Sequence, residues 1–201
     1  AANVFFPGEW HLTGPEADLA ATRAYVEIAV RRAAELGIAV MVFGSGRARN
    51  APEGFAQARA LEQVRDVLML MGDAAARYGV AIALEPLRRA ETNLLHTVAE
   101  AAEIVRPLGH PQVGVLADYY HMQQEQEPLA NLLSAGDLLR HVHVSDPDRL
   151  APTGGHDLTD FFSHLRRAGY RGRVSVECRW VDWDRESGEA ARLLRGYCPA
   201  D

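Results

Sequence analysis

The chain alternates between short apolar runs and longer segments with the spacing of amphipathic helices. The run 80–84 is bounded by Gly79 and ends at Glu85-Pro86. A continuous apolar run of this kind is typical of a strand buried on both faces, as in a parallel sheet. The same pattern predicts further strands at 4–6, 38–43, 113–117, 140–143 and 174–176.

Helical periodicity fills the segments between these runs, and glycine follows several of them as a stop signal. The predicted helices cover 18–36, 53–78, 93–108, 129–135, 158–168 and 188–194. Strict alternation of strand and helix predicts an α/β fold with a parallel sheet and right-handed crossovers. The two common architectures of this kind are an open doubly wound sheet and a (β/α)8 TIM-type barrel.

Polar residues stand where four successive strands end, and this favours the barrel, because an open sheet concentrates its site at one crevice. A complete barrel has about 250 residues. We therefore expect the 201 residues to form one domain over 1–201, a TIM-type barrel with about six strand–helix units, two fewer than the complete fold.

Glu85, Asp118, His143 and Glu177 are the residues at these four strand ends. Because parallel strands end at the same rim, the four side chains are expected to meet. A carboxylate is seldom buried without a cation or donor beside it. Three carboxylates and one imidazole suit Mn²⁺, Mg²⁺ or Co²⁺. The alternative is that they are helix caps or surface residues that follow strands.

Three loop residues are expected on the same rim. His121 lies three residues after Asp118, Arg149 six after His143, and Glu91 six after Glu85. His121 is placed to hydrogen-bond a substrate hydroxyl. The alternatives are an ordinary loop histidine for His121 and a solvated loop charge for Arg149. His141 alternates with His143, so we expect it one layer deeper in the barrel, as a satisfied interior histidine.

The turn Gly44-Ser45-Gly46 allows close backbone approach to a ligand such as a phosphate, but a simple strand-to-helix turn explains it equally well. It lacks the pattern of a P-loop. Arg47 and Arg49 follow this turn and would either bind an anion there or lie exposed.

Composition excludes several classes. The formal charge of −6 gives no basic footprint for nucleic acid. No apolar stretch approaches about 18 residues, so no membrane span is expected. The two cysteines, Cys178 and Cys198, form no disulfide framework, and no leader peptide is visible. We therefore expect a cytoplasmic protein.

An ordered set of sequence motifs resembles those of the sugar isomerase/epimerase group in the xylose isomerase-like TIM-barrel superfamily. This group includes ketose 3-epimerases and hydroxypyruvate isomerase-type enzymes. The motifs are Leu84-Glu85-Pro86-Leu87 with Arg89 and Glu91, Ala117-Asp118-Tyr119-Tyr120-His121-Met122, His141-Val142-His143-Val144-Ser145 with Arg149, and Val176-Glu177. Together they are specific to the superfamily, although each alone is weak.

The resemblance implies a divalent metal held by Glu85, Asp118, His143 and Glu177, with Mn²⁺ first and Mg²⁺, Co²⁺ or Zn²⁺ as alternatives. It also implies that Glu85 and Glu177 are the acid/base pair of enediolate chemistry. Glu91, His121 and Arg149 match the positions that contact a small sugar or hydroxy-carbonyl substrate.

Two departures from the family pattern carry expectations of their own. Aligned to the family, the chain starts at the third barrel strand and covers strands 3–8, so we expect a homo-oligomer, such as a dimer that completes the barrel. Arg88 stands where the family pattern has a small polar residue, and it would narrow the pocket or bind an acidic substrate.

Other functions stay open at this point. A similar ligand set could serve a metal-dependent dehydratase or lyase, and a truncated barrel could bind metal without activity. A DNA-repair endonuclease on the same barrel is disfavoured, because it needs a three-zinc cluster and a basic face.

Overall fold

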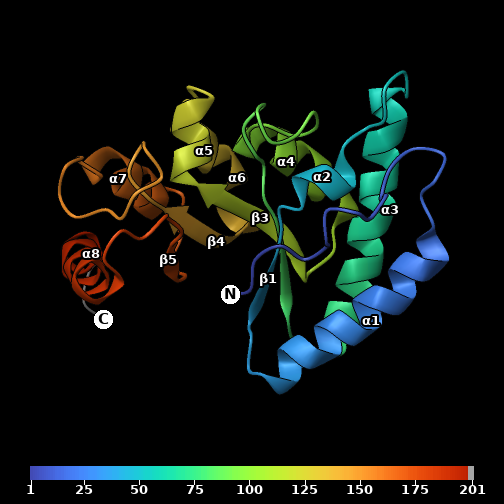
Figure 1. The fold of residues 1–201 in the computed structure, drawn as a ribbon, viewed down its shortest axis with the longest axis horizontal. Helices are drawn as coiled ribbons and strands as arrows, with labels where there is room; N and C mark the ends of the chain where they lie inside the picture. Colours follow the sequence, from blue (N-terminus) through green and yellow to red (C-terminus); the bar gives the residue numbers. More distant parts are fainter. Residues whose placement is uncertain (199–201) are drawn as a thin grey trace.

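Five parallel strands form the centre of the molecule, in a computed structural model that describes residues 1–198. The strands are β1 (Val40–Phe43), β2 (Ala81–Leu84), β3 (Val113–Asp118), β4 (Leu139–Val144) and β5 (Val174–Val176). Each strand pairs in parallel with the next one along the chain, in the order β1-β2-β3-β4-β5. The sheet curls as part of a barrel, which confirms the predicted fold class (Figure 1).

The prediction of a strand at 4–6 is wrong, because this segment forms no strand. Ala2 forms only an isolated parallel bridge with Met41, and Val4 has a φ of 54°, which ends extended pairing. A β-branched residue rarely adopts this conformation. The segment still lies along β1, because the Ala2 N–H donates to the Val40 carbonyl at 2.9 Å and the Phe5 N–H to the Val42 carbonyl at 3.3 Å.

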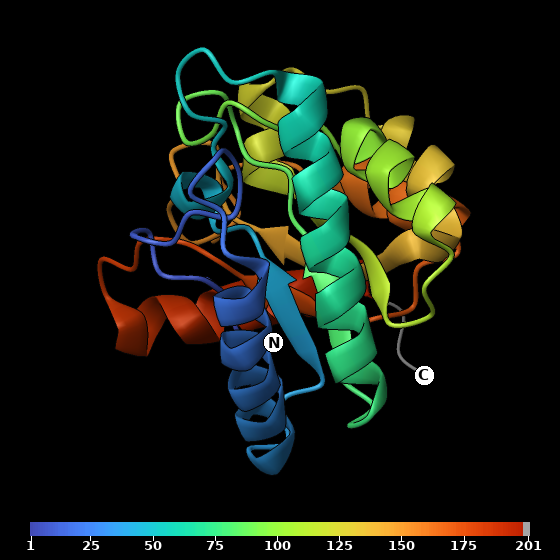
Figure 2. The same cartoon turned by 90° about the vertical axis from the view of Figure 1, so that its right-hand side faces the viewer.

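Helices cover the outer face of the sheet, and Figures 1 and 2 show α1 and α3 side by side there. The helices are α1 (Leu19–Glu35), α2 (Gly46–Arg49), α3 (Gln57–Ala76), α4 (Val98–Val105), α5 (Tyr119–Gln124), α6 (Asn131–Ala135), α7 (Thr159–Arg167) and α8 (Trp183–Tyr197). Short 3₁₀ turns follow α4 at Arg106–Leu108 and α6 at Gly136–Leu138. The main hydrophobic core lies between these helices and the sheet.

Side-chain caps explain where the observed helices differ from the predicted ones. Thr97 forms a capping box with Glu100, so α4 starts at Val98 and not near residue 93. Asp182 caps α8, which therefore starts five residues earlier than the predicted 188, at Trp183. Asp118 caps α5, a six-residue helix that the apolar pattern did not predict.

The inner face of the sheet carries a second, small apolar cluster of Val42, Ala83 and Leu116, all fully buried. His141 also lies inside, with its Nε2 atom 2.9 Å from the Ser175 hydroxyl. The expectation of a satisfied interior histidine is confirmed. Inward-facing residues thus pack the barrel interior and leave its carboxyl-end rim for the polar side chains.

Two further expectations concern the surface and the thiols. Among residues 1–198, no helix combines the length and the apolar character that a membrane span needs. Cys178 and Cys198 are both free thiols.

Candidate metal centre and substrate pocket

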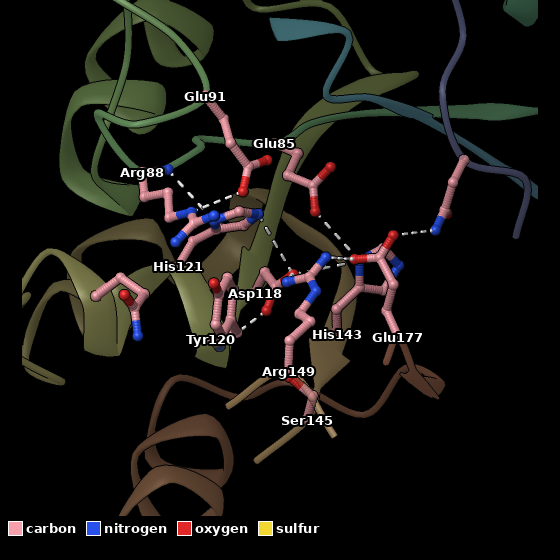
Figure 3. Close-up of polar contacts among 12 residues, drawn as sticks. Glu85, Arg88, Glu91, Asp118, Tyr120, His121, His143, Ser145, Arg149 and Glu177 are labelled. Atoms are coloured by element: carbon pink, nitrogen blue, oxygen red, sulfur yellow. Dashed lines mark hydrogen bonds and ion pairs between the residues drawn. The ribbon is translucent and has the colours of Figure 1, made fainter. Parts of the chain in front are cut away.

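Four side chains from four neighbouring strands converge at the carboxyl-end rim of the sheet (Figure 3). Glu85 directly follows β2, Asp118 ends β3, His143 lies near the end of β4, and Glu177 follows β5. One ligand atom from each lies within 4.8 Å of the others. The convergence that the strand-end pattern predicted is therefore present.

The imidazole of His143 is the centre of this cluster. Its Nδ1 atom lies 3.2 Å from Glu85 Oε1, 3.1 Å from Glu177 Oε2 and 3.9 Å from Asp118 Oδ2. Asp118 and His143 are 1% exposed and Glu85 is 5% exposed, while Glu177 is partly open to solvent. Nδ1 is thus the nitrogen that faces the carboxylates.

The donor set fits a divalent cation. Three carboxylates brought together in a buried place repel one another unless positive charge balances them. Carboxylate oxygens with one imidazole suit hard or borderline ions, and the set contains no thiolate that would favour a structural zinc. The four side chains that surround Nδ1 are therefore the ones that could hold a metal.

Arg149 places a positive charge at the edge of the cluster. Its Nη1 donates to Asp118 Oδ2 at 2.9 Å and its Nη2 to Glu177 Oε2 at 2.6 Å. The guanidinium also lies 4.5 Å from the centre of the Tyr120 ring. The residue has a φ of 61°, so a strained loop conformation holds this side chain over the rim.

These contacts shift the pKa values of the cluster. Burial alone would lower the pKa of His143, but its hydrogen bonds with Glu177 and Glu85 raise that pKa to about 10. Burial and the charge of Glu85 raise the pKa of Asp118. Burial opposes ionisation of Glu177, but His143 and Arg149 outweigh burial and lower the pKa of this carboxylate.

His121 is a neutral hydrogen-bond donor beside the cluster. Burial, followed by the charge of Arg149, lowers the pKa of His121 to about 3. The Arg88 backbone N–H donates to Nδ1 of His121 at 3.2 Å, so the ring proton is on Nε2. Nε2 lies 3.7 Å from Asp118 Oδ2, at the wall of the pocket.

A cavity of about 370 Å³ opens above the cluster. Glu85, Glu91, His121, Arg149 and Glu177 all line it, together with residues of the N-terminal segment and of the turn after β1. The structure thus brings all three predicted rim residues to one pocket.

Arg88 forms an ion pair beside the cavity. Its Nε donates to Glu91 Oε1 at 2.7 Å, and its guanidinium lies 5.2 Å from the centre of the Tyr120 ring. Arg88 therefore neutralises Glu91 at the rim of the cavity and is not among the residues that line it.

Glycine is required in the turn after β1 because other groups lie very close. A Cβ atom at Gly44 would lie 2.4 Å from Glu85 Oε2, and one at Gly46 would lie 2.7 Å from the Glu91 carbonyl oxygen. Ser45 adopts a left-handed conformation, and its hydroxyl accepts a hydrogen bond from the Phe6 N–H at 2.9 Å. The turn makes room for the Glu85 carboxylate and lines the cavity beside it.

Two features of the site were not foreseen. The Asn3 amide donates to Glu177 Oε1 at 2.6 Å, and no spacing in the sequence links these two residues. Arg49, expected to bind an anion or lie exposed, is fully buried. Arg47, its neighbour on the same short helix, is exposed and lines the cavity.

Known proteins resemble the chain in both sequence and fold. The xylose isomerase-like TIM barrel family matches residues 2–197. Over 120 residues the chain is 36% identical to 3-dehydro-D-guloside 4-epimerase of Escherichia coli (strain K12). This alignment covers 59% of the chain and 46% of the relative. It is 29% identical over 189 residues to a probable ketose 3-epimerase of Synechocystis sp., covering 89% of the chain and 63% of the relative. The matched part of the chain therefore spans less than two thirds of either relative.

Solved structures show the same fold. The crystal structure of 3-keto-D-glucoside 4-epimerase from E. coli has a TM-score of 0.72 at 29% identity and covers 86% of this chain and 68% of that one. D-allulose 3-epimerase from Methylomonas sp. has a TM-score of 0.81 at 23% identity, covering 92% and 72% of the two chains. The curled five-stranded sheet described above corresponds to part of such a barrel.

Proposed function

Because the chain belongs to the xylose isomerase-like TIM-barrel family, we propose that it is a divalent-metal-dependent sugar isomerase or epimerase. The single observation that carries this proposal is the convergence of Glu85, Asp118, His143 and Glu177, with ligand atoms within 4.8 Å of one another. The proposal covers the activity of the whole protein, and the named relatives, which are sugar epimerases, support it.

In this proposal the metal is held by Glu85, Asp118, Nδ1 of His143 and Glu177, and Mn²⁺ is our first choice for this donor set. A bound divalent ion polarises a substrate carbonyl and acidifies the neighbouring C–H bond. Asp118 Oδ1 accepts a hydrogen bond from the Tyr120 N–H at 2.8 Å, and this bond fixes the orientation of the Asp118 carboxylate.

Glu85 and Glu177 are the proposed acid/base pair. They approach Nδ1 of His143 from β2 and β5, at 3.2 and 3.1 Å, so they flank whatever occupies the centre of the cluster. One carboxylate removes the proton from the carbon beside the carbonyl, and the other carboxylic acid returns a proton. Return to the same carbon on the opposite face is epimerisation, and return to the adjacent carbon is isomerisation.

The remaining pocket residues bind and orient the substrate. The Arg149 guanidinium, 2.9 Å from Asp118 and 2.6 Å from Glu177, is placed to stabilise the negative charge of an enediolate oxygen. The Nε2–H of His121 donates to a substrate hydroxyl. Glu91, whose charge is balanced by Arg88, accepts from a hydroxyl farther along the sugar. A cavity of about 370 Å³ suits a small sugar.

We also place the protein in the cytoplasm. Both cysteines are free thiols, and one of them, Cys198, is exposed. Exposed thiols persist most readily in a reducing compartment.

Proton exchange with solvent tests the proposed chemistry. The protein is incubated with Mn²⁺ and a panel of ketoses and hydroxy-carbonyl acids in D₂O, and deuterium incorporation is followed by NMR. We expect exchange that requires both the metal and Glu177, and the position of the label separates epimerase from isomerase.

The test variant is Glu177→Gln. Its matched control is Glu53→Gln, at an exposed glutamate outside the pocket. Exchange that persists in Glu177→Gln at saturating Mn²⁺ would contradict the acid/base role of Glu177. Loss of water from a substrate without exchange into it would assign the site to a dehydratase. No exchange with any substrate, despite tight binding of Mn²⁺, would contradict the proposed isomerase activity.

A further inference from the structure

Arg49 is a buried cation that the proposed mechanism does not use. It ends α2, directly after the glycine turn that faces Glu85, and its side chain is fully buried. Its Nη1 donates to the Phe43 carbonyl at 3.1 Å, while no acceptor among residues 1–198 meets its Nε or Nη2. Its guanidinium lies 5.8 Å from the centre of the Phe43 ring.

The buried charge of Arg49 lowers the stability of the fold. A buried cation without an ion pair loses its hydration, and one hydrogen bond with a weak cation–π contact offsets only part of that loss. An apolar side chain of similar length would fill the same space without this penalty. The position of the charge is therefore the feature that needs an explanation.

The guanidinium of Arg49 lies beside the backbone of a proposed metal ligand. The Phe43 carbonyl that accepts from Arg49 also accepts from the Glu85 N–H, at 3.1 Å in both cases. Burial lowers the pKa of Arg49 to about 10, and the negative charge of Glu85 raises it in part, so the side chain is a cation at neutral pH. After burial, Arg149 and Arg88, its charge also contributes to the lowered pKa of His121.

We propose that Arg49 is a positioning residue that acts on the site through Glu85, as a fixed positive charge behind the carboxylate cluster. This inference rests on the proposed function for its effect on turnover, but its effect on cation binding stands without it. Three carboxylates, a divalent ion and Arg149 together are neutral when His143 is uncharged. The charge of Arg49 then leaves one positive charge in excess, which favours an enediolate with one negative charge.

The proposal predicts opposite effects on metal binding and on turnover. A positive charge near the site weakens cation binding, because like charges repel more strongly in a buried place. Removing it should tighten Mn²⁺ binding at least about threefold. The same removal should lower kcat for solvent exchange about tenfold, with little change in KM. A residue that only supports the fold would not improve metal binding when it is replaced.

The test compares Mn²⁺ affinity, measured by isothermal titration calorimetry, in Arg49→Met, Arg49→Gln, Arg49→Lys and the wild type. Met removes the charge and the donor, Gln keeps a donor for the Phe43 carbonyl, and Lys keeps the charge. Arg31→Met is the control for net charge, because Arg31 pairs with Glu35 on the exposed face of α1.

We expect Arg49→Met and Arg49→Gln to bind Mn²⁺ more tightly, and Arg49→Lys and Arg31→Met to match the wild type. Unchanged or weaker binding in Arg49→Gln would overturn the proposal, even if Arg49→Met does not fold. Binding by Arg49→Lys as tight as that of Arg49→Gln would also overturn it, because the charge would then not be the cause. If the wild type shows no exchange with any substrate, the proposed function fails, while the affinity series still decides the role of Arg49.

Discussion

At the residue scale, the protonation state of the carboxylate cluster follows from how charges balance around His143. Protonated His143 and Arg149 face three carboxylates, and each of these ion pairs lies in a buried or half-buried place. A metal ligand must use the unprotonated Nδ1 atom, so a divalent ion takes over the charge that the imidazole proton supplies. Metal binding and protonation therefore compete at one nitrogen.

This competition predicts that metal binding releases a proton. Contacts with Glu177 and Glu85, which outweigh burial, raise the pKa of His143 to about 10, so at pH 8 the ring carries a proton that it must lose. We expect about one proton released per Mn²⁺ at pH 8 and an affinity that rises about tenfold per pH unit between pH 7 and 9. Calorimetry in buffers of different ionisation enthalpy measures the release. A binding enthalpy that does not depend on the buffer would contradict the protonated state.

Gly44 is predicted to be essential for the position of the Glu85 carboxylate. A Cβ atom there would lie 2.4 Å from Glu85 Oε2, so Gly44→Ala must displace this oxygen. We expect Mn²⁺ affinity to fall at least about tenfold. Gly196→Ala is the matched control, because no atom lies within 4 Å of its added Cβ, and it should leave Mn²⁺ affinity unchanged. Wild-type affinity in Gly44→Ala would show that the carboxylate is not held against the turn.

The site residues could be predicted from the sequence because strand ends impose their placement. Glu85, Asp118 and Glu177 each stand where an apolar run stops, and parallel strands bring such residues to one rim. Asn3 and Arg49 could not be predicted in this way. The contact of Asn3 with Glu177 depends on how the N-terminal segment crosses β1, and the burial of Arg49 depends on packing around a four-residue helix.

At the element scale, side-chain caps decide where the helices begin, and apolar periodicity does not record them. The predicted helix at 93–108 gives way to α4 at Val98 because the Thr97 side chain accepts from the Glu100 N–H at 3.1 Å. The carboxylate of Glu127 adds two more acceptors, for the N–H groups of Val98 and Ala99. Short α5 was missed for a related reason, since its start depends on the Asp118 carboxylate.

Removing the cap of α4 should lower stability without changing the site. Thr97→Ala leaves the Glu100 N–H without its side-chain acceptor, and we expect a loss of about 1 kcal/mol in the free energy of unfolding. Urea denaturation of the metal-free protein measures it, with Thr97→Ser as the variant that keeps the acceptor. A loss in Thr97→Ser as large as in Thr97→Ala would show that the hydroxyl is not the cause.

At the scale of the whole molecule, the strand–helix alternation fixed the architecture correctly, but the number of strands depended on one residue. The segment at 4–6 follows the edge of β1 and supplies backbone hydrogen bonds, yet Val4 interrupts it at a φ of 54°. Apolar character alone does not reveal such an interruption. At the opposite edge, within residues 1–198, β5 pairs with β4 on one side only, and its residues are half-buried.

An open edge of this kind predicts self-association. Unpaired backbone groups of an edge strand bind another strand readily. We propose a homodimer in which the β5 edge is covered, and we expect light scattering coupled to size exclusion to give twice the mass of one chain. Val176→Lys, on this edge strand, should shift the equilibrium toward the monomer. A monodisperse wild-type monomer at micromolar concentration would contradict the proposed dimer.

The central claim is that one divalent ion binds where four strand ends meet, and anomalous diffraction from crystals soaked in Mn²⁺ tests it most directly. The account predicts one strong anomalous peak, in contact with Glu85, Asp118, Nδ1 of His143 and Glu177, whose ligand atoms lie within 4.8 Å of one another. An Mn²⁺ peak elsewhere, or a peak that persists in Asp118→Ala crystals at unchanged occupancy, would contradict it.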